Sequence, residues 1–139
     1  MTDTTVVELR TVGAGPTALG NAGPFALVVD RPVAAGGGGL GFNGAQLLYL
    51  AIAACISNDI HREAAALGVA ISGVAVTVEG TFAGRSAASG PIDVDVRVES
   101  SAGDDDVQRL LDEVERVAEI PLTLRQPTPM AIRRTVVRR

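Results

Sequence analysis

The chain has 139 residues, of which 47% are hydrophobic and only 3% aromatic, so it can build one domain around a core of aliphatic side chains. Its net charge of −4 comes from 16 acidic and 12 basic residues, every basic residue being arginine, which argues against nucleic acid as the main partner. The longest apolar run, Leu47 to Ile56, is far shorter than the roughly 20 residues that span a bilayer. We therefore expect a single domain, 1–139, that is soluble, cytoplasmic and free of any membrane contact.

Two strands are expected near the N-terminus, at Val6 to Val12 and Phe25 to Asp30, because both segments are rich in β-branched residues. The segment between them, GAGPTALGNAGP, has the glycines and prolines of turns.

A loop is expected at Gly36 to Gly39, since neither a helix nor a central strand tolerates four glycines well. Glycine amides before a helix can bind phosphate, but the chain has no lysine and no complete phosphate-loop pattern, so a nucleotide site has little support.

A long helix is predicted from Asn43 to Leu67. Asn43 offers a side-chain oxygen to the first free amides, Gln46 completes a capping box, and Gly68 ends the helix. The first half of this helix is apolar on every face, so it must be covered on all sides.

The second half of the chain predicts a hairpin, a helix and a last strand. Apolar and polar residues alternate in Val69 to Phe82 and in Ile92 to Val98, as in half-buried antiparallel strands. A second helix begins at Asp104 and is expected to end at Pro121, and Met130 to Val137 is expected to add a strand. The predicted order is β-β-α-β-β-α-β, an α+β domain. Because so small a sheet and one amphipathic helix leave part of the central helix uncovered, we expect a second copy to cover the rest, in a homodimer.

Cys55 is the only cysteine, so no disulfide can form within the chain. In the middle of an apolar helix, a thiol is often a small hydrophobic packing residue. A reactive thiolate would need a cation beside it, and Arg62 lies two helical turns away, although Asp59 and Glu63 are nearer partners for that arginine. The single histidine, His61, falls on the far side of the helix, and one histidine with one cysteine is too few for a transition-metal site.

The stretch from Asp30 to Phe82 resembles the OsmC/Ohr family of small homodimeric thiol peroxidases. The resemblance rests on the glycine-rich loop, the asparagine that opens a long helix, the segment NGAQLLYLAIAAC and the hairpin that follows. It implies antiparallel sheets packed around a long central helix, an intertwined homodimer and an organic hydroperoxide as substrate. It also implies that Cys55 is the peroxide-reacting thiol.

The chain departs from this family at three positions. Ala45 stands where the family has a glutamate that orients the activating arginine, and no arginine lies between Arg10 and Arg31, where the family places that arginine. Ile120, just before Pro121, stands where the family has a second, resolving cysteine. A two-cysteine cycle is therefore excluded by composition.

Two functions remain open from the sequence, besides a purely structural dimer that binds no ligand. The first is at most a weak one-cysteine peroxidase with a degenerate site, linked to oxidative stress, reduced by an external thiol, without a cofactor, and with Arg62, Arg31 or Arg125 as candidate activating residues. The second is a non-catalytic homodimer that binds a small hydrophobic ligand, with Cys55 as packing. Both predict an apolar pocket near Cys55, for which the candidate residues are Phe42, Leu48, Ala51, Ile52 and Ile120.

Overall fold

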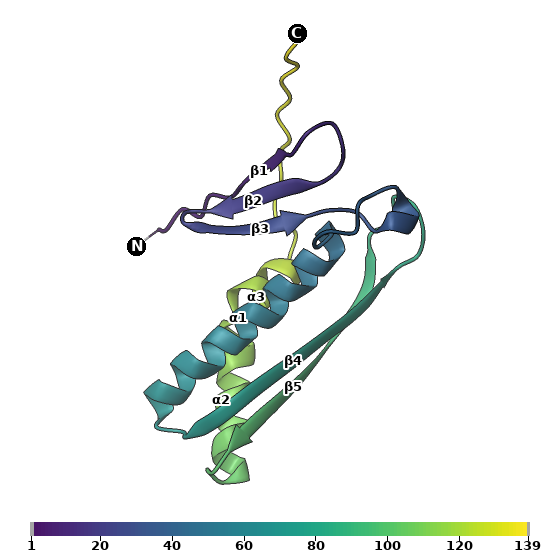
Figure 1. Cartoon of the computed structure of the whole chain (residues 1–139). Helices are drawn as coiled ribbons and strands as arrows, with labels where there is room; N and C mark the ends of the chain where they lie inside the picture. Colours follow the sequence, from purple (N-terminus) through teal and green to yellow (C-terminus); the bar gives the residue numbers. More distant parts are fainter. Residues whose placement is uncertain (1, 139) are drawn as a thin grey trace. The chain divides into compact units, whose positions relative to one another are not determined.

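The computed structural model describes residues 2–138 and confirms an α+β chain with two antiparallel sheets (Figure 1). Its elements are, in order, β1 (Glu8–Thr11), β2 (Ala18–Ala22), β3 (Phe25–Val29), the 3-10 helix η1 (Val33–Ala35), α1 (Gly44–Leu67), β4 (Ile71–Phe82), β5 (Ser89–Ser100), α2 (Asp104–Val117) and α3 (Glu119–Leu124). The chain forms two compact units, Met1–Leu50 and Ala51–Arg139, whose boundary falls within α1. The expectation of a single domain, 1–139, stays a prediction.

The first unit contains a three-stranded antiparallel meander in the order β1-β2-β3. Leu9 and Leu27 lie on either side of Gly20 in the register, and Ala22 lies opposite Phe25. The sequence predicted only two strands here and was wrong to assign all residues between them to turns. The middle strand, ALGNA, escaped detection because it has no β-branched or aromatic residue.

The helix α1 was predicted almost to the residue. The amide of Asn43 donates to Gln46 Oε1 at 2.9 Å, and the amide of Gln46 donates to Asn43 Oδ1 at 3.0 Å, which confirms the capping box. At the other end Gly68 has a φ of 67°, and the amide of Val69 donates to the carbonyl of Ala64 at 2.9 Å. This left-handed residue ends the helix as expected.

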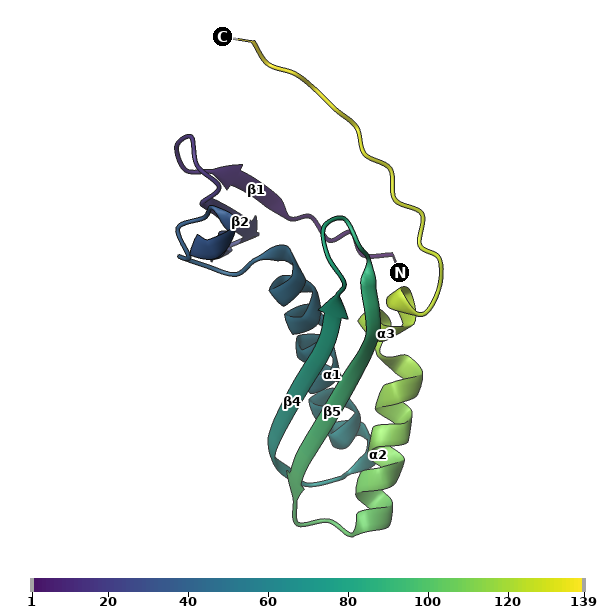
Figure 2. The same ribbon diagram turned by 90° about the vertical axis from the view of Figure 1, so that its right-hand side faces the viewer.

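The second unit contains the β4-β5 hairpin, with α2 and the part of α1 from Ala51 onward running alongside it (Figures 1 and 2). Its core includes a stripe of residues four apart on α1 that are buried, as are two residues of α2. These residues are Ile52, Ile56, Ile60 and Ala64 of α1 and Leu110 and Val114 of α2.

The C-terminal part differs from the sequence prediction in two ways. The second helix ends at Val117, before Pro121, which instead lies in the first turn of α3, where proline is tolerated. The strand expected at Met130 to Val137 is wrong, because no residue from Pro127 to residue 138 belongs to a helix or strand. Alternation of apolar residues indicated a strand, but a strand also needs a neighbouring strand to complete its hydrogen bonds.

None of the helices formed by residues 2–138 is both long enough and apolar enough to cross a membrane.

Candidate functional site

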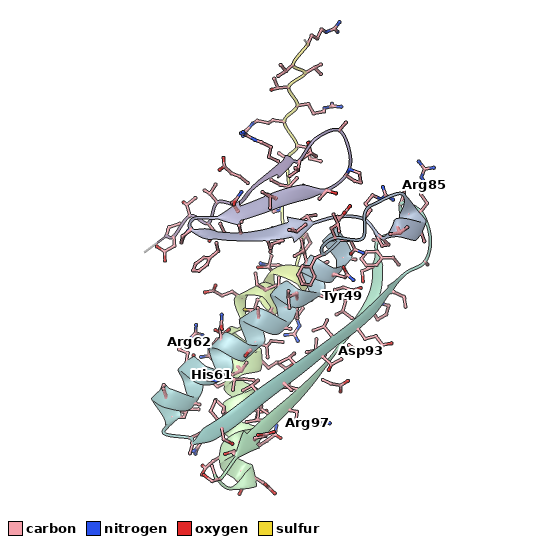
Figure 3. All side chains as sticks on the ribbon, viewed as in Figure 1. Tyr49, His61, Arg62, Arg85, Asp93 and Arg97 are labelled. Atoms are coloured by element: carbon pink, nitrogen blue, oxygen red, sulfur yellow. The ribbon has the colours of Figure 1, made fainter. Side chains whose placement is uncertain are left out.

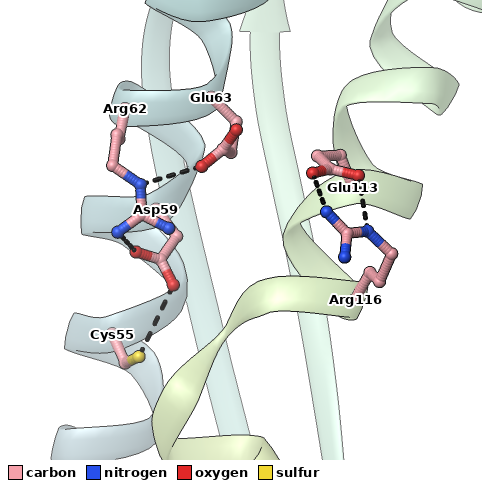
Figure 4. A network of polar contacts seen from close by, with 6 residues as sticks. All are labelled: Cys55, Asp59, Arg62, Glu63, Glu113 and Arg116. Atoms are coloured by element: carbon pink, nitrogen blue, oxygen red, sulfur yellow. Dashed lines mark hydrogen bonds and ion pairs between the residues drawn. The ribbon is translucent and has the colours of Figure 1, made fainter.

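The thiol of Cys55 lies on α1, half-buried, and has a carboxylate as its hydrogen-bond partner. Its sulfur is 3.7 Å from Oδ2 of Asp59, one helical turn further along the chain (Figure 4). Asp59 is itself buried, with 6% of its surface exposed. The helix therefore presents the thiol and the carboxylate on one face.

Arg62 binds the same carboxylate from the other side. Its Nη1 is 2.9 Å from Oδ1 of Asp59, and its Nε is 2.8 Å from Oε1 of Glu63. The hydrogen bond to Glu63 and the charge of Asp59 raise the pKa of Arg62 above its ordinary value. The sequence predicted that Asp59 and Glu63 would be nearer partners for Arg62 than Cys55, and these contacts confirm it.

His61 is exposed, and its Nδ1 lies 2.8 Å from the carbonyl oxygen of Ser57 on the preceding turn (Figure 3). Within the part of the chain that the structure describes, no three histidine, cysteine or acidic residues gather as a possible metal site.

The other candidate activating arginines have different surroundings. Arg125 pairs with Glu115 at 3.4 Å, and both side chains are exposed. Arg31 belongs to the first unit, where its backbone amide donates to Asp30 Oδ1 at 2.7 Å. Their predicted role beside Cys55 stays a prediction.

The five candidate pocket residues are divided between the two units. Phe42, which is exposed, and Leu48, which is half-buried, belong to the first unit. In the second unit Ile52 is buried in the core, Ile120 is half-buried and Ala51 is exposed. The pocket that these residues were expected to form stays a prediction.

Asp30 is a polar centre that the sequence analysis missed. The residue is 2% exposed, and its carboxylate accepts hydrogen bonds from the amides of Arg31, Gly38 and Leu40 at 2.7, 3.3 and 3.2 Å and from the hydroxyl of Thr17 at 3.0 Å. Desolvation raises the pKa of this carboxyl, but the four hydrogen bonds together outweigh it and lower the pKa below its ordinary value. The sequence feature that could have indicated this site is a single acidic residue between an apolar strand and a run of glycines.

The glycines of the loop make room for this arrangement. A Cβ on Gly37 would lie 2.0 Å from the carbonyl oxygen of Arg31, and one on Gly41 would lie 2.1 Å from that of Val28. The loop amides that could have received a phosphate thus converge on the carboxylate of Asp30. The glycine run is explained by an anion within the chain, and it gives no support to a nucleotide site.

An apolar groove of about 330 Å³ lies on one face of the three-stranded sheet. Gly20 has no side chain and Ala22 only a methyl group, so these two residues of the middle strand leave space between Leu9, Phe25 and Leu27 of the outer strands. The remaining lining residues are Val7, Glu8, Asn21, Ala26, Val29 and Leu47. All of them belong to the first unit, and none is a predicted pocket residue.

The sequence profile of the family described as OsmC-like protein matches residues 36–133, which is more than half of the chain. The chain belongs to the OsmC-like protein family. This match includes α1 with Cys55, the hairpin, and both C-terminal helices. No curated protein sequence matches this OsmC-like chain significantly.

Solved structures share the fold of this OsmC-like protein at low sequence identity. An OsmC-like protein from Mycoplasma pneumoniae is 17% identical, with a TM-score of 0.78 and coverage of 90% of this chain and 89% of its own. The organic hydroperoxide resistance protein OsmC of Legionella pneumophila is 20% identical, with a TM-score of 0.65 and coverage of 88% and 90%. A Vibrio cholerae protein with captopril bound in one of its active sites is 22% identical, with a TM-score of 0.65 and coverage of 90% and 86%.

Proposed function

We propose that this OsmC-like protein is a one-cysteine, thiol-dependent peroxidase that reduces organic hydroperoxides under oxidative stress. The observation that carries the proposal is the single thiol of Cys55, half-buried on α1 within the family-matched segment. The structural likeness to an organic hydroperoxide resistance protein supports the substrate class. A lone cysteine also fits a reducing compartment such as the cytoplasm.

The cycle uses one sulfur and two molecules of an external thiol. The Cys55 thiolate attacks the O–O bond, takes one oxygen to become a sulfenic acid, and the leaving alkoxide takes up a proton to give the alcohol. A first external thiol condenses with the sulfenic acid and releases water. A second external thiol then attacks the mixed disulfide, which returns Cys55 to the thiol and leaves an external disulfide.

The active form is proposed to be a homodimer. The chain exposes large apolar side chains on β3, on α1 and in the C-terminal segment, including Phe25 at 76%, Leu50 at 49% and Ile132 at 77%. A second copy of the chain would cover such side chains, and monomeric soluble proteins rarely expose large contiguous apolar patches. Light scattering that gives the mass of one chain at micromolar concentration would contradict the dimer.

The peroxidase proposal is tested by hydroperoxide consumption with an external dithiol. Cumene hydroperoxide should disappear in proportion to the wild-type protein and not with Cys55→Ser. Because there is one cysteine, labelling with a sulfenic-acid probe reports on Cys55 alone. Equal consumption by the two proteins would contradict the proposal.

A second candidate function is the binding of a small hydrophobic ligand without catalysis. The apolar groove on the sheet favours it, because its volume lies within the range of ligand pockets. A Cβ on Gly20 would meet only ordinary contacts of 3.8 and 3.9 Å, so a side chain can be added there without a clash at its first atom, and Gly20→Leu is designed to fill the groove. A fluorescent fatty acid should bind the wild type and Cys55→Ser equally and bind Gly20→Leu at least about tenfold more weakly. Equal binding to all three proteins would contradict this function.

A further inference from the structure

The hydrogen-bond partner of the Cys55 thiol is an acid. The structure places Oδ2 of Asp59 3.7 Å from the sulfur, and Asp59 is shielded from water. A negative charge on the sulfur would face the negative charge of this carboxylate across a short distance. Charges about 4 Å apart interact appreciably near a protein surface, so the two anions disfavour each other.

Arg62 lies on the other side of the Asp59 carboxylate from the sulfur, so it does not activate the thiol. Arg62 contacts Oδ1 of Asp59, whereas the thiol contacts Oδ2, so the carboxylate stands between the guanidinium and the thiol (Figure 4). Arg62 also binds Glu63, and its side chain is 57% exposed, which weakens its effect through solvent. Arg62 reduces the charge of Asp59 but does not replace it as the partner of Cys55.

Other charged residues nearby do not change the relation between the Asp59 carboxylate, Arg62 and the Cys55 sulfur. Glu63 and Glu119 both contribute negative charge to the surroundings of Arg62. On α2, Arg116 is held by Glu113 through contacts of 2.5 and 2.9 Å, so its charge is largely committed to that pair.

We propose that Asp59 is a positioning residue that lowers the reactivity of the Cys55 sulfur, and that Arg62 limits the strength of this effect. The carboxylate accepts a hydrogen bond from the thiol, and its negative charge repels the anionic sulfur that any attack on an O–O bond requires. The inference rests on the proposed function, because it concerns the reactivity of the same sulfur. It names a group that would slow the proposed peroxidase.

The proposal is tested by the alkylation rate of Cys55 with iodoacetamide at neutral pH. Asp59→Asn keeps the shape and removes the charge, so alkylation should become about tenfold faster. Arg62→Gln leaves the charge of Asp59 uncompensated, so alkylation should become slower than in the wild type. Asp93→Asn, an exposed site on β5, removes one charge elsewhere and should leave the rate unchanged.

The opposite signs separate an electrostatic role from a structural one. A variant that only loosens α1 exposes the sulfur, so both substitutions would then speed alkylation and lower the midpoint of urea unfolding. That result would overturn the proposal, as would an Asp59→Asn rate no higher than that of Asp93→Asn.

Hydroperoxide consumption distinguishes this inference from the proposed function. Faster alkylation of Asp59→Asn without any peroxide consumption by it or the wild type would support the role of Asp59 and contradict the peroxidase. Peroxide consumption by the wild type with unchanged alkylation in Asp59→Asn would overturn the role of Asp59 and leave the peroxidase standing.

Discussion

The backbone amide of Gly38 donates to Oδ1 of Asp30 at 3.3 Å, across eight residues of chain. Together with the amides of Arg31 and Leu40, this contact closes the glycine-rich loop around a buried carboxylate. The loop leads directly to Asn43, where the capping box begins α1. The conformation of the segment before the cysteine-bearing helix therefore depends on one acid.

Replacing Asp30 with asparagine should destabilise the first unit. The side chain keeps its shape, but one acceptor oxygen becomes an NH2 group that faces amide and hydroxyl donors. We expect the Tm to fall by roughly 5–10 °C in calorimetry. Asp3→Asn, on an exposed residue of the same unit, is the control and should leave the Tm within about 1 °C.

The effect of this substitution should depend on pH. The pKa of Asp30 lies below its ordinary value of 3.8, so the folded state favours the charged carboxylate. Its contribution to stability is full above about pH 4 and is lost as the pH falls through the lower, folded-state pKa. The difference in Tm between the wild type and Asp30→Asn should shrink as the pH is lowered below about 4. A difference that stays constant down to pH 2 would contradict this account.

Gly37→Ala should lower the stability of the protein because the backbone of Arg31 lies too close for a side chain. Its Cβ would lie 2.0 Å from the carbonyl oxygen of Arg31, so the backbone must move. We expect a loss of about 2–3 kcal/mol in the free energy of unfolding by urea. Gly15→Ala meets nothing within 4 Å and has no positive φ, so it should cost less than about 0.5 kcal/mol.

Asn43→Ala should weaken the start of α1. It removes the oxygen that accepts the amide of Gln46, and a lost cap of this kind costs about 1 kcal/mol. Asn58→Ala, on an exposed position within the same helix, should be neutral or slightly stabilising because alanine has the higher helix propensity. Urea unfolding followed by circular dichroism at 222 nm compares the two, and equal midpoints would show that the cap contributes nothing.

Leu110→Ala should create a cavity in the second unit. The leucine is fully buried on α2, and removing it should cost about 3 kcal/mol in the free energy of unfolding. Leu122→Ala on α3, where the side chain is 42% exposed, is the control for the same chemical change. Its cost should be at most about half as large.

The elements predicted best were those whose signals are local. The boundaries of α1 follow from Asn43, Gln46 and Gly68, which act within one turn of the helix ends. The alternation of valines in β4 and β5 likewise identified a hairpin, with Val76 opposite Val96 in the register. In each case the residues that form the contact are close in sequence or repeat with the period of the element.

The features that were missed depend on partners distant in sequence. β2 is a strand because Gly20 pairs with Leu9 on one side and Leu27 on the other, not because of its own composition. Residues from Pro127 onward have the composition of a strand but no neighbour to pair with in the described chain. The contact between Cys55 and Asp59 is the exception, because the two residues are only four apart on one helix and their spacing could have indicated it, whereas the sequence analysis considered only Arg62 as a partner of the thiol.

The carboxylate within the glycine-rich loop has a consequence for reading related sequences. A glycine run before a helix is commonly taken as evidence of an external anion, yet here Asp30 acts as an intramolecular ligand for the same amides. An acidic residue at the end of the preceding strand therefore indicates that the loop amides already have an acceptor within the chain. It occupies the donors that a phosphate would need. Searches for phosphate-binding loops that ignore such an acid will return false positives of this kind.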